Sequence, residues 1–225
     1  MPARPNRASR VSVALCLSLF FPFSVSAEGS MTPRPDLRPG NGTQVHPANA
    51  VIDQQGGYDD FLAALRYKES RGDYQAVNTL NFLGAYQFGE AALVDLGFVR
   101  PDRDIYDNDF SGGFTGKHGI RSVRDFLSNP AVQDAAAREW MRIMWRYIEA
   151  EGLRQYAWRD VGGVVLSPSG MLAATHLLGS GGLRDYIRSN GRADIRDPYG
   201  MPLRTYITDL GGFEIPFAPR RPGFS

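Results

Sequence analysis

Residues 58–89 read YDDFLAALRYKESRGDYQAVNTLNFLGAYQFG, a helical pattern followed by a loop rich in Gly, Asp and Asn. Phe61, Leu62 and Leu65 recur at helical spacing, which predicts a helix that ends near Glu69. The partial negative charge at a helix C-terminus disfavours a carboxylate there by about 0.3–1 kcal/mol. An acid at this place therefore needs an explanation, either as a solvated glutamate at a frayed helix end or as a functional group.

A chemical role for Glu69 follows from its surroundings in the sequence. Apolar neighbours such as Leu65 and Tyr67 favour burial, and burial raises the pKa of a carboxyl group. A carboxylic acid that stays protonated near neutral pH can act as a general acid in the cleavage of a glycosidic bond. Glu69 is therefore a candidate catalytic acid.

The rest of the domain is expected to be helical as well. Helical spacing and capping residues predict further helices at residues 89–98, 122–129, 131–152, 167–179, 182–189 and 202–210. Ser122 is the expected N-cap of the second of these, and Ser167 or Ser169 that of the fourth, which Gly179 should end. Only residues 114–120 suggest part of a small hairpin. The pattern predicts a mainly α fold, all-α or α+β, in one domain.

The N-terminal region has the layout of a secretory signal peptide. Residues 1–10 carry three arginines and no acid, residues 11–25 are almost wholly apolar, and a small-x-small cleavage signal ends at Ala27. A membrane anchor is the alternative, but Pro22 interrupts the apolar run, which is short for the ~20 residues of a span. We expect a periplasmic or secreted protein with no stable membrane anchor after cleavage.

Domain boundaries follow from composition. We expect a signal peptide at residues 1–27, a Pro-, Gly- and Asn-rich flexible linker at 28–56, a folded domain at 57–213 and a C-terminal tail at 214–225. Cleavage after Ala27 removes Cys16, the single cysteine, and changes the formal charge from +1 to −2. The mature protein would have no disulfide and no reason to bind nucleic acid.

No metal site or cofactor is predicted by the sequence. The three histidines are far apart and not at ligand spacing. The acidic loop between Asp102 and Asp109 is similar in composition to a calcium-binding loop, but it lacks the spacing and the closing glutamate, so we expect no calcium site there.

Three sequence blocks together resemble a known superfamily. ESRGDY at 69–74, GAYQF at 84–88 and MLAATHLLGSGGLRDYI at 171–187 occur in the order of the motifs of lytic transglycosylases and goose-type lysozymes. Two departures stand out, because Ala85-Tyr86 replaces Leu-Met in the second motif and Thr175-His176 replaces Tyr-Asn in the third. The resemblance covers roughly residues 58–190 and implies a lysozyme-like domain with a substrate groove.

The resemblance also implies roles for individual residues. Glu69 would be the catalytic acid and then the base, and Ser70 would orient the sugar or Glu69. Gly84 would allow close backbone approach, Tyr86 would form a wall and Gln87 would bind substrate. Thr175 and His176 would contact the catalytic centre, although a packed helix histidine is nearly as good an explanation of His176. The implied partner is the glycan strand of peptidoglycan, with an envelope-spanning machine as a further partner to consider.

The implied reaction depends on the number of carboxylates. A lytic transglycosylase would cleave the β-1,4 bond between N-acetylmuramic acid and N-acetylglucosamine with Glu69 alone, and close a 1,6-anhydro ring. A hydrolytic muramidase would need a second carboxylate about 5–9.5 Å away, for which Glu90 and Asp73 are the candidates. A secreted peptidoglycan-binding protein without catalysis is the third hypothesis. We favour the transglycosylase.

Overall fold

The computed structural model of the 225-residue chain describes residues 56–193 and 195–223. The expected signal peptide and residues 28–55 of the expected linker lie outside this part of the chain. Within the described residues, no helix is both long and apolar enough to span a membrane.

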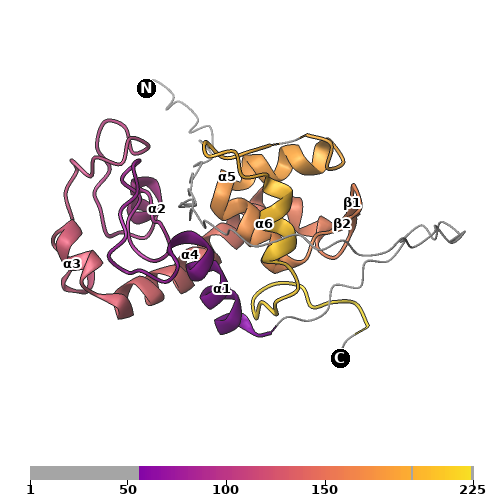
Figure 1. The fold of residues 1–225 in the computed structure, drawn as a ribbon, viewed down its shortest axis with the longest axis horizontal. Helices are drawn as coiled ribbons and strands as arrows, with labels where there is room; N and C mark the ends of the chain where they lie inside the picture. Colours follow the sequence, from indigo (N-terminus) through magenta and orange to yellow (C-terminus); the bar gives the residue numbers. More distant parts are fainter. Residues whose placement is uncertain (1–55, 194, 224–225) are drawn as a thin grey trace, which may run out of the picture.

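The described chain is mainly helical, as the sequence predicts. Figure 1 shows α1 and α4 between two groups of elements, with α2 and α3 at one end and α5, α6 and the strands at the other. The α-helices are α1 (Tyr58–Ser70), α2 (Glu90–Asp95), α3 (Val123–Leu127), α4 (Pro130–Ala150), α5 (Pro168–Arg188) and α6 (Leu203–Asp209). Two short 3-10 helices, η1 (Lys117–Gly119) and η2 (Leu153–Tyr156), and strands β1 (Asp160–Val161) and β2 (Val164–Val165) complete the fold.

Helix α5 forms the centre of the core. Every residue from Pro168 to Ser180 is buried, so this part of the helix is enclosed on all sides. A β-carbon on Gly170 would lie 2.6 Å from the carbonyl oxygen of Ile207, so this glycine permits close packing of α5 against α6. The small and apolar residues of this segment therefore reflect its burial.

Helix starts follow the capping residues expected from the sequence. The Ser122 side chain accepts a hydrogen bond from the Asp125 N–H and caps α3. Ser167, not Ser169, caps α5 by accepting from the Gly170 N–H. Each cap satisfies a backbone donor that the first helical turn leaves without a partner.

The helices expected at residues 167–179 and 182–189 are both present and meet at a kink. They form the single element α5, with a break in helical geometry at Leu178 and Gly179, where Gly179 has φ +69° and ψ 173°. Glycine adopts this positive φ without the steric cost of a β-carbon. The prediction that Gly179 interrupts the helix is thus correct, but the chain resumes helical geometry immediately.

The hairpin lies elsewhere than expected. The antiparallel pair is β1 with β2, in which Asp160 pairs with Val165 and Val161 with Val164. Residues 114–120 instead contain η1 and one isolated bridge between Phe114 and Val99. Each strand has only two residues, so no alternating pattern was available to predict it.

The C-terminal segment packs on the domain beyond the expected boundary at residue 213. The Glu214 N–H donates to the Gly56 carbonyl at 2.9 Å, Ile215 is buried, and the Trp158 indole donates to the Pro219 carbonyl at 2.7 Å. The ring of Phe217 contacts that of Tyr58 edge-on at 5.5 Å. Residues 214–219 therefore belong to the folded domain.

Candidate active site

Glu69 occupies the last turn of α1, as the sequence predicts. The helix ends at Ser70, and Arg71 follows in a left-handed conformation with φ +59°. The Glu69 side chain points into the protein and the residue is 1% exposed. A solvated glutamate at a frayed helix end is therefore excluded, and the carboxyl group lies both in the apolar interior and at the negative end of a helix.

Two polar side chains from distant helices contact the Glu69 carboxyl group. The Tyr206 hydroxyl on α6 donates a hydrogen bond of 3.0 Å to Glu69 Oε1. His176 Nε2 on α5 lies 3.7 Å from the same oxygen, which is beyond hydrogen-bonding distance. Glu69 Oε2 is buried and has no hydrogen-bond partner among the described residues. One oxygen of the carboxyl group is thus anchored and the other is not.

Burial is the largest influence on the pKa of Glu69. Desolvation raises its pKa from 4.5 to about 8, because the apolar interior disfavours the charged form. The hydrogen bond from Tyr206 and the charge of Lys68 oppose this increase, and the charge of Asp197 adds to it. Glu69 is therefore mostly protonated at neutral pH.

His176 is neutral next to this acid. Desolvation lowers its pKa to about 4, and a hydrogen bond with the backbone of Tyr86 only partly opposes the decrease. Since Glu69 is protonated and His176 is not, the pair at neutral pH consists of two uncharged groups. The site avoids a buried unpaired charge in this way.

Hydrogen bonds with Ser70 and Gln133 hold the loop at Gly84 and Ala85 next to the end of α1. The Ser70 hydroxyl donates to the Ala85 carbonyl at 2.9 Å, which ties the end of α1 to this loop. Gln133 Oε1 on α4 accepts from the Ala85 N–H at 2.9 Å. Gly84 has φ +74°, and a β-carbon there would lie 2.0 Å from Gln133 Oε1. The missing β-carbon of Gly84 thus makes room for the Gln133 side chain, and not for a substrate as the sequence motif implied.

Three of the expected substrate-contacting residues are enclosed by protein. Tyr86 is 1% exposed and its hydroxyl donates to Asp134 at 2.8 Å. Gln87 is fully buried and donates to the Gly84 carbonyl at 2.8 Å. Thr175 is also buried, and its hydroxyl has no hydrogen-bond partner among the described residues. In this structure these three side chains lie inside the protein and not on an exposed surface that a substrate could contact.

The sequence offered Asp73 and Glu90 as a possible second carboxylate, but neither is among the charges that act most strongly on Glu69. Asp73 is exposed, and its carboxylate accepts from the Gln75 N–H in a local turn. Glu90 is buried at the start of α2, within a different group of acids. The carboxylate that acts on Glu69 is Asp197, which is buried and precedes α6.

Neither Tyr206 nor Asp197 is expected in the site from the sequence. Asp197 Oδ1 accepts from the N–H groups of Tyr199 and Met201, while Oδ2 is buried with no hydrogen-bond partner among the described residues. The sequence DPYG at 197–200 indicates a turn and gives no sign of burial. Tyr206 fits the apolar face of a short helix, and its hydrogen bond spans 137 residues. No local pattern could have paired either residue with Glu69.

Comparison of the chain with protein-family models, with curated proteins and with solved structures gave no significant match.

Proposed function

We propose that this protein is a secreted or periplasmic enzyme that cleaves peptidoglycan glycan strands, with Glu69 as its single catalytic acid. The observation that carries the proposal is the buried Glu69 carboxyl group, with a pKa of about 8. The sequence motifs around Glu69, Gln87 and His176 supply the substrate class, and the protonated acid supplies the chemistry.

In the first step, Glu69 donates its proton to the glycosidic oxygen between N-acetylmuramic acid and N-acetylglucosamine. Oε1 is held by Tyr206, so the proton resides on Oε2, which no described protein group engages. Because Oε2 is buried, neighbouring side chains must move before the sugar can reach it. The acetamido oxygen of the substrate stabilises C1 as the bond breaks.

In the second step, Glu69 acts as the base. The carboxylate left after proton transfer is stabilised by the Tyr206 hydroxyl, which is already hydrogen-bonded to Oε1. Its high pKa makes it a competent acceptor for the proton of the C6 hydroxyl, which then closes the 1,6-anhydro ring on C1. The same environment thus suits both roles, since a group with a pKa near the working pH gives and takes protons readily.

A hydrolytic muramidase is the second candidate, and Asp197 is the observation that favours it. Its buried Oδ2 has no hydrogen-bond partner among the described residues, and its charge acts on Glu69. A hydrolase needs such a second carboxylate to activate water or to form a covalent intermediate. We favour the transglycosylase because the superfamily motifs support it and Asp197 is largely engaged with the N–H groups of its own turn.

Purified murein sacculi test the proposal. The wild-type protein should release soluble fragments that carry 1,6-anhydro-N-acetylmuramic acid by mass spectrometry, and Glu69→Gln should release none. Asp73→Asn is the matched control, because it removes an exposed acid near the site in sequence and should leave the rate unchanged. Reducing ends in the wild-type digest would establish the muramidase instead, and equal activity of Glu69→Gln would remove Glu69 from the mechanism.

A further inference from the structure

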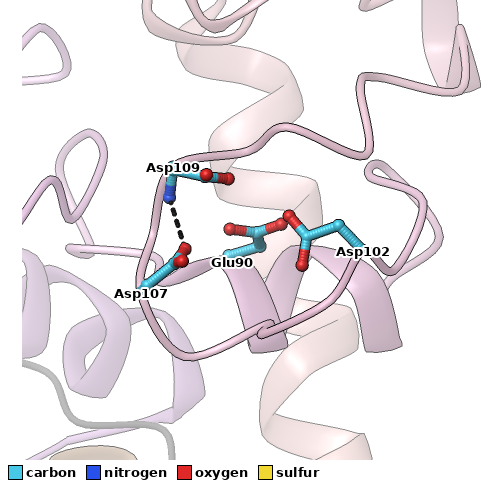
Figure 2. Close-up of side chains that lie close together, drawn as sticks. All are labelled: Glu90, Asp102, Asp107 and Asp109. Carbon is cyan, nitrogen blue, oxygen red and sulfur yellow. Dashed lines mark hydrogen bonds between the residues drawn. The ribbon is translucent and has the colours of Figure 1, made fainter.

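A second group of carboxylates lies away from Glu69, around the start of α2. Three acids of the loop at residues 100–113 meet one acid of the helix, and Figure 2 shows Glu90 between the side chains of the loop. One oxygen of each lies within 4.8 Å of the others, and we call these residues the carboxylate cluster: Glu90, Asp102, Asp107 and Asp109.

The cluster lacks the cations that normally neutralise such a group. Among residues 56–193 and 195–223, none of the ion pairs includes any of the four carboxylates. Acids this close repel each other unless a cation or protons compensate their charge. Exposed acids tolerate this repulsion in water, whereas a buried acid does not.

Glu90 is the buried acid of the cluster. The residue is 0% exposed, and its Oε2 accepts a hydrogen bond of 2.9 Å from the Phe110 N–H. Its Oε1 is buried and has no hydrogen-bond partner among the described residues. In Figure 2 the carboxylate points towards the aspartates of the loop. A buried carboxyl oxygen without a hydrogen-bond partner is costly, and a metal ion among the four acids would satisfy it.

The loop also carries part of a calcium-binding pattern that sequence analysis discounted. Asp107, Asp109 and Ser111 occupy alternate positions, and Gly112 follows them, as in the first half of an EF-hand loop. A β-carbon on Gly112 would lie 1.9 Å from the Arg100 carbonyl oxygen, so the glycine is required there. At the twelfth position of this pattern, where an EF-hand loop has a glutamate, the chain has His118. Glu90 supplies a glutamate in space from the preceding helix.

We infer that the carboxylate cluster is a binding site for a hard divalent cation, and that the ion is Ca²⁺. All four ligands are carboxylate oxygens, the donors that Ca²⁺ and Mg²⁺ take. The four oxygens lie within 4.8 Å of one another, which an ion held at about 2.3–2.6 Å from each oxygen can bridge, and the EF-hand-like order of Asp107, Asp109 and Gly112 favours Ca²⁺ over Mg²⁺. The ion would fasten the loop at residues 100–113 to α2. Glu90 then serves as a structural ligand, not as a second catalytic carboxylate, and this assignment does not depend on the proposed function.

Calcium binding can be measured on the whole protein without any glycan substrate. The protein is stripped with EDTA, and calorimetric titration and the melting temperature are compared with CaCl₂, with MgCl₂ and without added ion. We expect binding heat with Ca²⁺ and a rise of about 5 °C or more once Ca²⁺ exceeds its Kd about a hundredfold. Mg²⁺ should have a much smaller effect.

Two variants of the same loop separate ligation from loop structure. Asp109→Asn removes a cluster member, and Asp104→Asn is its matched control, because both exposed aspartates accept a hydrogen bond from the N–H two residues later. Asp109→Asn should lose most of the Ca²⁺-dependent rise in melting temperature. In EDTA its melting temperature should equal or exceed that of the wild type, because one of the mutually repelling negative charges is removed. Asp104→Asn should keep the full response.

Several results would overturn the inference. These are no binding heat at millimolar Ca²⁺, an equal response to Mg²⁺, or an equal loss of response in both variants. If Asp109→Asn proves both less stable than the wild type in EDTA and unresponsive to Ca²⁺, Glu90→Gln provides a second test. It must also abolish the Ca²⁺-dependent rise in melting temperature if the cluster binds the ion.

Discussion

Glu69→Gln should make the stability of the protein less dependent on pH while it abolishes cleavage. The wild-type carboxyl group has a pKa of about 8 when folded and 4.5 as its reference value. The folded state therefore binds this proton more tightly, and the group's contribution to stability is fully present below pH 4.5. It is lost as pH rises towards 8, because the unfolded chain ionises and the folded protein does not.

The size of the effect follows from this pKa difference. Each pH unit between the two values costs the wild type about 1.36 kcal/mol of unfolding free energy. Between pH 5 and pH 7.5 the wild type should lose about 3 kcal/mol that Glu69→Gln does not lose. The glutamine keeps an acceptor for the Tyr206 hydroxyl, but its N–H₂ group replaces the unengaged Oε2 and costs about 1–3 kcal/mol. That cost is the same at every pH and does not alter the difference.

Urea unfolding of both proteins at pH 5, 6, 7 and 7.5 measures this difference directly. Above pH 5.5, the unfolding free energy of Glu69→Gln should increase relative to that of the wild type by about 1 kcal/mol or more per pH unit. Murein digestion by the same samples should be lost by a factor of about 10²–10⁴. A gap that stays constant from pH 5 to pH 7.5 would refute a raised pKa for Glu69 and, with it, the basis of its role as an acid.

Three further predictions concern the neighbours of this group. Tyr206→Phe removes the hydrogen bond that favours the Glu69 carboxylate, so the loss of activity at high pH should move about one pH unit higher; an unchanged pH–rate profile would contradict this contact. Gly84→Ala should destabilise the protein by about 2 kcal/mol or more in urea unfolding, because its β-carbon meets Gln133 at a positive φ, and a loss below about 0.5 kcal/mol would show that the loop adapts. Asp197→Asn should keep the anhydro product and lose less than about tenfold in rate, whereas a muramidase would lose about 10²–10⁴-fold.

The helices of this protein follow from local patterns in the sequence. The first is predicted to end near Glu69 and is found at Tyr58–Ser70, because apolar residues at helical spacing are a local signal. The position of Glu69 at a helix end follows from the same pattern. The hairpin was placed wrongly because two-residue strands carry no periodicity, and the C-terminal segment was placed wrongly because its prolines hide the burial of Ile215.

The chemical environment of Glu69 was decided by the tertiary structure. The sequence contains one acid after an apolar helix, and this pattern fits an exposed side chain as well as a buried one. Burial removes the water that would stabilise its charge, and that burial arises only when α5 and α6 bring His176 and Tyr206 against the end of α1. The separation of Glu90 from this site is likewise invisible in the sequence, because Glu90 joins the aspartates of a loop through space. A pKa depends on the distances and solvation of groups far apart in the chain, so the sequence determined which residue is the acid candidate and only the fold determined that it is protonated.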